Sequence, residues 1–207
     1  MSNNDKKQGL LVVISGPAGS GKGTVIAELL RDENCCFSVS ATTRAPRPGE
    51  RDGVNYHFLT REEFEGRIAA GDLLEYTEYC GNYYGTLKKQ TQEVLDRGCH
   101  LLLEIEVEGA ANVKRQYPDA VTVMLLPPSY ATQEARLRGR GTETEEKILL
   151  RLARAREEVL HVDEYDYIVF NRDGRADEAV EEVRAILRAE QAAVRRNANV
   201  AEIYFQT

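Results

Sequence analysis

One short segment constrains the fold of this chain more than any other. Residues 16–24 read Gly-Pro-Ala-Gly-Ser-Gly-Lys-Gly-Thr and directly follow the apolar run of residues 10–15. An apolar run, a glycine-rich turn and a helix start in this order predict a strand that enters a phosphate-binding loop. Glycines let backbone N–H groups approach an anion closely, and the helix beginning near Lys22 adds its positive end. The alternative is a glycine-rich turn that binds no ligand. It does not explain why strand, loop and helix signals follow one another in this order.

Two side chains of this loop carry chemistry. The Lys22 ammonium is placed to reach the β- and γ-phosphates of a bound nucleotide. The usual pattern has serine or threonine directly after the lysine, whereas this chain has Gly23 there and Thr24 next. Thr24 is therefore the local hydroxyl that is available to Mg²⁺. The Gly-Lys-Gly-Thr variant resembles nucleoside monophosphate kinases more than GTPases.

Size and charge exclude several classes of protein. With 207 residues, 42% of them hydrophobic, the chain is predicted to form one core domain with insertions. A formal net charge of -7 argues against the basic face that non-specific nucleic-acid binding needs. The sequence has no apolar run of about 18 residues, as a membrane helix requires, and no signal-peptide core in residues 1–9. We expect a cytoplasmic protein without nucleic-acid or membrane partners, and the oligomeric state stays open.

The four cysteines carry no recognisable pattern. Cys35, Cys36, Cys80 and Cys99 fit no zinc-ligand spacing, and no secretory context supports disulfides. We therefore expect free thiols.

Strand-like and helix-like segments alternate along the chain. This order predicts an α/β fold with a central, mainly parallel sheet flanked by helices. Strands are expected at residues 10–15, 37–40, 100–106, 121–126 and 165–171, and helices are expected to begin near Gly21, Arg61, Thr86, Gly109, Ser129, Thr144 and Ala176. Residues 40–86, with extended runs at 56–59 and 73–79, are predicted to form an inserted subdomain. Residues 137–151, glycine- and arginine-rich at their start, are predicted to form a mobile lid.

A second constellation lies at the start of the predicted subdomain. Arg44 and Arg47 stand three residues apart, and Pro46 and Pro48 stiffen the segment and keep it out of a helix. Two guanidinium groups on a rigid loop suit a phosphate monoester, which accepts bidentate hydrogen bonds, and Tyr56 adds a hydroxyl donor. The residues alone leave a solvated basic loop equally open.

This constellation and its neighbours strongly resemble the guanylate kinase family. Every specified position of the family signature is filled, by Thr42, Thr43, Arg44, Arg47, Glu50, Gly53, Tyr56 and Phe58. The resemblance covers roughly residues 8–190 and continues through the segments 81–86, 103–106, 137–141 and 165–171. It implies a core of residues 8–39, 87–136 and 152–190, a GMP-binding subdomain at 40–86, a lid at 137–151 and a C-terminal tail at 191–207.

The resemblance implies transfer of the γ-phosphoryl group of ATP to GMP, giving ADP and GDP in purine nucleotide metabolism, with Mg²⁺ as cofactor. The implied ATP-binding residues are Gly16, Pro17, Ala18, Gly19, Ser20, Gly21, Lys22, Gly23, Thr24 and Asn171. The implied GMP-phosphate ligands are Arg44, Arg47, Tyr56 and Tyr84, and the implied guanine-reading residues are Ser40, Glu75, Thr86 and Glu106. Arg140 and Arg151 are the implied lid arginines, which act on the transferred phosphoryl group with Lys22 and Arg47. Thr24 and Glu104 are implied to hold Mg²⁺, Glu104 through water.

The chain departs from the family pattern at a few positions. Glu104 and Glu106 stand where many relatives have aspartate, Glu108 where glutamine is common, and Arg172 where an acidic residue is usual. Two other functions stay open: a related kinase for another phosphorylated small molecule, and a non-catalytic interaction module. The intact phosphate loop argues against the module. No residue clearly reads a ribose 2′-hydroxyl, so dGMP is expected as a second substrate.

Overall fold

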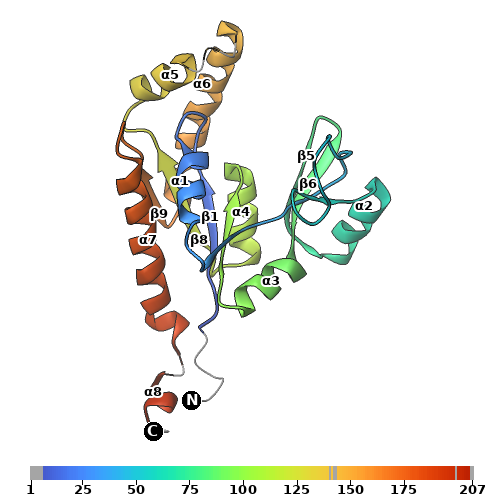
Figure 1. The fold of residues 1–207 in the computed structure, drawn as a ribbon, viewed down its shortest axis with the longest axis vertical. Helices are drawn as coiled ribbons and strands as arrows, with labels where there is room; N and C mark the ends of the chain where they lie inside the picture. Colours follow the sequence, from blue (N-terminus) through green and yellow to red (C-terminus); the bar gives the residue numbers. More distant parts are fainter. Residues whose placement is uncertain (1–6, 140, 142–143, 199, 206–207) are drawn as a thin grey trace.

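The computed structural model describes residues 7–139, 141, 144–198 and 200–205. Within these ranges a parallel sheet carries helices on both faces, and a second, smaller sheet stands to one side (Figure 1). The predicted α/β class with a central parallel sheet is thereby confirmed. None of the helices in the described ranges has the length and apolar character needed to cross a membrane.

The central sheet has the strand order β2-β7-β1-β8-β9, and every neighbouring pair is parallel. The strands are β1 Leu11–Ser15, β2 Cys35–Phe37, β7 His100–Glu104, β8 Val121–Leu126 and β9 Tyr167–Phe170. All residues of β1 and β8 are buried, as expected for parallel strands that are covered on both faces. The carboxyl ends of β1 and β7 meet at one edge, which is where such sheets place their ligands.

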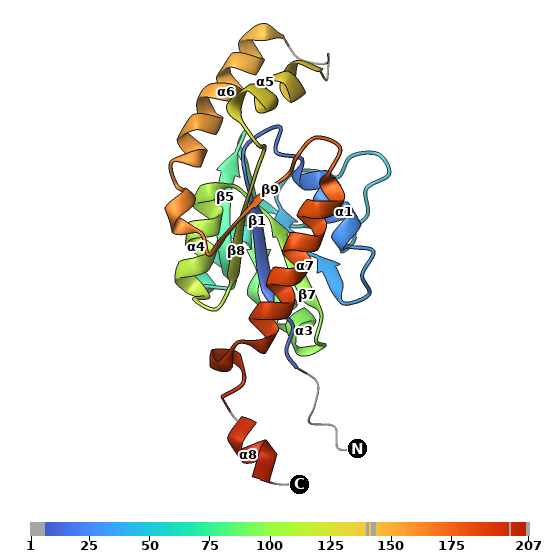
Figure 2. The same cartoon turned by 90° about the vertical axis from the view of Figure 1, so that its left-hand side faces the viewer.

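Helices cover both faces of this sheet (Figure 2). They are α1 Lys22–Leu29 and α7 Ala176–Ala192 on one face, and α3 Lys88–Asp96 and α4 Val107–Gln116 on the other. Val12 and Ile14 of β1 pack into the core cluster shared with α1 and α7, whereas Leu11 and Val13 pack into the cluster beneath α3 and α4. Successive side chains of β1 point to opposite faces of the sheet, so this one strand contributes to both core clusters.

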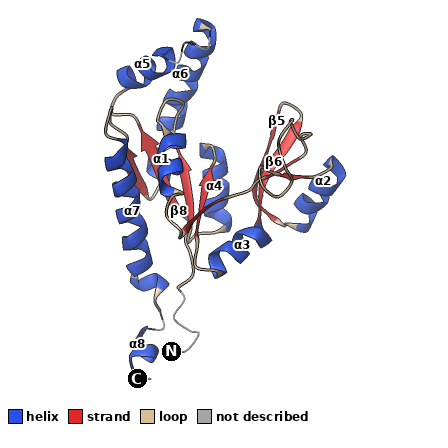
Figure 3. Cartoon of the chain, in the orientation of Figure 1, coloured by secondary structure: helices blue, strands red, loops and turns tan. Residues whose placement is uncertain are grey.

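The smaller sheet has the order β4-β3-β6-β5 and one helix against it (Figure 3). Its elements are β3 Ala41–Thr42, β4 His57–Phe58, α2 Arg61–Ala70, β5 Leu73–Tyr79 and β6 Asn82–Leu87. Phe64 of α2 is fully buried and stacks on Tyr83, with ring centroids 5.2 Å apart. Thr60 and Glu63 form a reciprocal capping box that fixes the start of α2. Leu74 packs into the cluster beneath α4, which joins this unit to the core.

Two helices, α5 Tyr130–Gly139 and α6 Glu145–Val159, form a pair beyond the carboxyl edge of the central sheet (Figure 1). Their own small core consists of Leu137, Ile148 and Leu152, and Ala18 of the glycine-rich loop packs against it. The predicted lid spans the end of α5 and the first half of α6. Its mobility stays a prediction. The remaining elements are the short 3-10 helices Val162–Glu164 and Val194–Arg196 and the terminal helix α8 Val200–Phe205.

One element prediction is wrong, and one helix begins two residues later than expected. The strand expected at residues 37–40 is divided, because β2 ends at Phe37 and β3 of the other sheet begins at Ala41. Ser40 consequently lies in the link between the two sheets, where its carbonyl accepts a hydrogen bond from the backbone N–H of His57. The helix expected near Thr86 begins at Lys88, because the preceding residues pair antiparallel with β5. Tertiary pairing decided both boundaries.

The expectation of four free thiols is also wrong for one pair. Cys36 and Cys99 form a disulfide, although 63 positions separate them in the sequence. The parallel register of β2 and β7 sets Cys35 beside His100 and Cys36 beside Leu101, so the two sulfur atoms meet across neighbouring strands. Spacing along the chain does not reveal this proximity. Cys35 and Cys80 are free.

Candidate active site

The glycine-rich loop connects β1 to α1 with three glycines in conformations that other residues avoid. Gly16, Gly19 and Gly21 have φ angles of 150°, 85° and 87°. The Lys22 ammonium folds back and donates a hydrogen bond to the carbonyl oxygen of Gly16. Burial lowers the pKa of Lys22, and the carboxylates of Glu104, Glu158 and Glu106 oppose that shift. The loop therefore holds a half-buried cation close to carboxylates from two other elements.

The outer side of the loop is held by α5 and by the residue after β9. Gln133 donates to the carbonyl of Ala18 at 2.8 Å. Arg136 donates to the carbonyls of Gly19 at 3.1 Å and of Asn171 at 2.8 Å. The Asn171 amide, 5% exposed, donates to the carbonyl of Ser20 at 2.9 Å. These contacts fix the backbone of the loop before any nucleotide binds.

Gly21→Ala is expected to destabilise the protein. A Cβ at Gly21 would lie 2.2 Å from the Asn171 side-chain nitrogen, on a backbone with a φ of 87°. The cost is expected to be about 1–3 kcal/mol, because a left-handed backbone and a buried hydrogen bond are both disturbed. Thermal unfolding measures this effect. Gly23→Ala is the matched control, since Gly23 lies in α1 with nothing within 4 Å of its Cβ position. Equal melting temperatures for both variants would refute the expectation.

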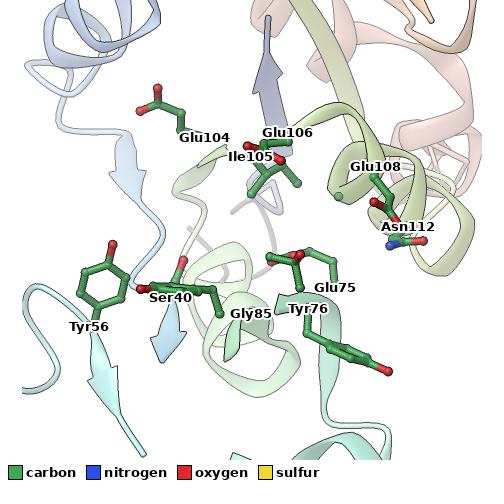
Figure 4. Close-up of a pocket in the computed structure, with 13 residues that line it drawn as sticks. Ser40, Tyr56, Glu75, Tyr76, Gly85, Glu104, Ile105, Glu106, Glu108 and Asn112 are labelled. Carbon is green, nitrogen blue, oxygen red and sulfur yellow. The ribbon is translucent and has the colours of Figure 1, made fainter. Parts of the chain in front are cut away.

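A cavity of about 310 Å³ lies between the smaller sheet and the start of α4. Figure 4 shows residues of the link, of both sheets and of α4 around it, with Glu75 and Ser40 on its subdomain side and Glu108 and Asn112 on its α4 side. The predicted site residues that line it are Ser40, Tyr56, Glu75, Tyr84, Glu104 and Glu106. The structure thus brings together side chains that lie up to 66 positions apart, counted from 40 to 106.

Glu75 is the buried acid of this cavity. Its residue is 6% exposed, and burial raises the pKa of its carboxyl group. The Thr86 hydroxyl, on the facing strand, donates to one carboxylate oxygen at 2.6 Å. The other oxygen lies 3.7 Å from the position that a Cβ atom would take if one were added to Gly109 in α4. A buried carboxylate that is oriented by the hydroxyl and the backbone of Thr86 is suited to accept from a ligand with two adjacent N–H donors.

The loop that carries Arg44 and Arg47 is organised by Glu50, an acid that is not among the predicted site residues. Glu50 accepts from the Arg44 guanidinium at 2.9 and 3.0 Å and from the backbone N–H of Arg47 at 2.7 Å. The Arg44 guanidinium carbon lies 5.4 Å from the centroid of the Tyr56 ring, which lies 6.1 Å from the ring of Tyr84. The four predicted phosphate ligands are therefore neighbours. The signature itself contains Glu50, and the need of the Arg44 guanidinium for an anchoring acid could have identified it.

A second cavity, of about 700 Å³, lies between the glycine-rich loop and α6. Among the residues that line it are Gly16, Lys22 and Arg151. It shares residues 104–106 with the first cavity, so the two meet at the turn after β7. The Ser15 hydroxyl at the end of β1 donates to the carbonyl of Ile105 at 2.8 Å and fixes this turn. Two ligands, one in each cavity, would meet at Glu104 and Glu106.

The other predicted residues lie in different surroundings. Thr24 is exposed in the first turn of α1, and Arg140 lies outside the described residues. Asn171 is occupied with the loop backbone, and its contact with a nucleotide stays a prediction.

Sequence reasoning missed Gln133, Arg136, Glu50, Arg154 and Glu158. The i, i+4 spacing of Arg136 and Arg140 on an expected helix is a signal that could have identified Arg136.

The oxygen donors near the loop fit a hydrated Mg²⁺ ion. The Thr24 hydroxyl and the Glu104 carboxylate, which ends β7 in an exposed position, are both hard oxygen ligands. Mg²⁺ commonly keeps several waters and binds through one or two protein oxygens together with nucleotide phosphates. The chemistry of the two donors agrees with that mode, and Glu104 lines the cavity beside the loop; their role as Mg²⁺ ligands stays a prediction.

A parallel sheet whose first strand runs into a glycine-rich loop and a helix, with two adjoining cavities at its carboxyl edge, is typical of phosphate-loop kinases. The family model described as "Guanylate kinase" matches residues 8–190. The chain belongs to the guanylate kinase family, and it is an ATP:GMP phosphotransferase.

The similarity extends over nearly the whole length of the relatives. A guanylate kinase of Halalkalibacterium halodurans is 51% identical over 187 residues, which cover 90% of this chain and 91% of the relative. A guanylate kinase of Clostridium tetani is 47% identical over 190 residues, covering 92% and 90%. The crystal structure of guanylate kinase from Anaplasma phagocytophilum superimposes with a TM-score of 0.69 at 35% identity and covers 92% of this chain and 90% of that one.

Proposed function

We propose that this enzyme transfers the γ-phosphoryl group of ATP to GMP, giving ADP and GDP, and that it serves purine nucleotide metabolism in the cytoplasm. The observation that carries the proposal is the meeting of two cavities at the turn after β7. One cavity faces the phosphate loop and Lys22, and the other contains the desolvated Glu75. A phosphate donor and a guanine-bearing acceptor placed in these cavities have their reacting groups side by side.

The proposed roles follow the two cavities. The phosphate loop holds the ATP phosphates, and Arg44, Arg47, Tyr56 and Tyr84 hold the GMP phosphate. Guanine is read by Glu75, which accepts from N1–H and the 2-amino group, with support from Ser40, Thr86 and Glu106. Adenine has no 2-amino group and an acceptor at N1, so it would leave the buried Glu75 unpaired.

Transfer needs no general base, because the GMP phosphate is already a nucleophile. The work of the protein is to position the two phosphates and to match the charge on the transferred group. Lys22, Arg47 and the lid arginines Arg140 and Arg151 are the proposed cations for that charge. When bound with ATP at Thr24 and Glu104, Mg²⁺ supplies further neutralisation of the phosphate oxygens. Closure of the lid over both nucleotides would exclude water from the transfer.

A coupled assay that measures ADP formation against a panel of nucleoside monophosphates tests the proposal. GMP is expected to be the preferred acceptor over AMP by roughly 10⁴-fold or more in kcat/KM, since a site built to pair polar groups rejects a mismatched base. We also expect dGMP to be accepted, because no side chain is assigned to the ribose 2′-hydroxyl. An enzyme that turned over AMP or UMP as well as GMP would contradict the acceptor assignment.

Arg44→Ala and Arg47→Ala are each expected to raise KM for GMP by roughly 30-fold, because a charge-assisted phosphate contact is lost. Arg47→Ala should also lower kcat, because Arg47 is proposed to face the transferred group. Lysine at either position should restore only part of the loss, since a point charge does not reproduce the planar fork. Initial rates at varied GMP measure the effect. Arg51→Ala, in the same exposed loop, is the control, and an unchanged KM in both test variants would make this loop a solvated surface.

A further inference from the structure

The second half of α6, which follows the predicted lid, presents to the site a charged pair that the proposed mechanism does not use. The Arg154 guanidinium donates to Glu106 Oε2 at 2.6 Å. Its Nε lies 3.4 Å from Glu158 Oε1, one turn further along the same helix. Glu106 belongs to the turn after β7, 48 positions earlier in the sequence. Arg154 therefore connects α6 with the turn at which the two cavities meet.

The charges around this contact are unequal. The acceptor cavity is lined by the carboxylates of Glu75, Glu104, Glu106 and Glu108, and its described lining residues include no lysine or arginine. Arg154 lines the larger neighbouring cavity and forms an ion pair with one of these acids, Glu106. Since an anionic phosphate has to enter this region, an unpaired Glu106 carboxylate would repel it.

The exposure of the pair argues against a role in holding the fold together. The side chain of Arg154 is 56% exposed and that of Glu106 is 69% exposed. Ion pairs in such positions contribute little to folding stability. The same pair can matter for ligand binding. A freely rotating carboxylate side chain has to be ordered when it binds a ligand, and that ordering costs free energy.

We propose that Arg154 is a positioning residue of the acceptor site: it holds the Glu106 carboxylate in place, offsets its charge and thereby links the second half of α6, beyond the predicted lid, to the acceptor pocket. This inference rests on the proposed function, because it takes Glu106 as a guanine-reading group. Among the hydrogen bonds of the described residues, Arg154 uses Oε2 of Glu106 and none uses Oε1. One oxygen is thus held by α6, which leaves the other as the oxygen that would accept from a ligand donor.

The expected signature is a change in GMP binding with little change in transfer. Arg154→Ala should raise KM for GMP about fivefold, the range for an exposed ion pair, and leave kcat nearly unchanged. Arg154→Lys should be intermediate, because the ammonium keeps the charge but not the geometry of the guanidinium. Thermal unfolding is expected to show equal melting temperatures for these variants and the wild type.

Two controls make the test specific. Arg156→Ala removes the same charge from the same helix. The Arg156 guanidinium carbon lies 4.6 Å from the centroid of the Tyr130 ring instead of against Glu106, so the KM of this variant for GMP should not change. In a double-mutant cycle with Glu106→Gln, Arg154→Ala should have no further effect, because its partner is already neutral.

Equal effects of the two arginine variants, or full additivity with Glu106→Gln, would overturn the inference. A wild-type enzyme without GMP kinase activity would instead overturn the proposed function. The two failures are therefore distinguishable in the same assay.

Discussion

Lys22→Ala is expected to lower kcat by roughly 10²–10³-fold, the typical loss when one group that stabilises transition-state charge is removed. The ammonium lies at the mouth of the phosphate loop and is half-buried, so its charge is poorly screened there. GMP occupies the other cavity in our proposal. Its dissociation constant should therefore change much less than kcat.

Steady-state rates and equilibrium GMP binding, measured on the same preparations, separate these effects. Lys22→Arg is a useful companion, since it keeps the charge but needs more room beside the carbonyl of Gly16. Lys114→Ala serves as the control for loss of a lysine, because Lys114 pairs with Asp166 away from both cavities. A Lys22→Ala enzyme with near-normal turnover would remove the phosphate-loop assignment.

Glu75→Gln is expected to reduce kcat/KM for GMP by roughly 10²-fold or more, because the neutral amide presents a donor where guanine also presents one. ATP affinity should stay nearly unchanged, since Glu75 lines the acceptor cavity and does not line the cavity beside the phosphate loop. Comparing kcat/KM for GMP and AMP in both proteins measures the change in base preference. Retention of the wild-type preference for GMP would show that Glu75 does not read the base.

The same substitution should leave the fold as stable as before, or more stable. Burial raises the pKa of Glu75, so its ionised form opposes folding at neutral pH. Because the folded-state pKa lies above the unfolded one, this penalty is absent below the ordinary pKa of glutamate. It grows as the pH rises toward the folded-state pKa and is constant above it.

The Glu75→Gln variant should therefore melt at or above the wild-type temperature at pH 7, and the difference should vanish in acid. Glutamine keeps an oxygen that can accept from Thr86, which is why no hydrogen bond needs to be lost. Thermal unfolding across this pH range checks the sign. A large loss of stability at pH 7 would mean that Glu75 serves the fold and not a ligand.

Local patterns alone predicted much of the core. The strand at Val121–Leu126 and the helix starts at Arg61 and Ala176 are confirmed, because apolar periodicity and the Thr60 cap act within a few residues. The phosphate loop was equally readable, since its glycines are required by the backbone of the loop itself. Family membership followed from motifs that lie in single continuous segments.

Pairing between distant segments decided the remaining features. The division of residues 37–40 between two sheets, the Cys36–Cys99 disulfide and the late start of α3 all depend on which strand lies beside which. The same holds for Glu50 between two arginines and for Arg154 against Glu106, contacts that side chains make only after the backbone has folded. By itself, the sequence determined the class of fold and the residue types of the site, because these depend on short-range periodicity and motif chemistry. Only the tertiary structure decided which charges face one another, because Coulomb and hydrogen-bond interactions depend on distances that spacing along the chain does not set.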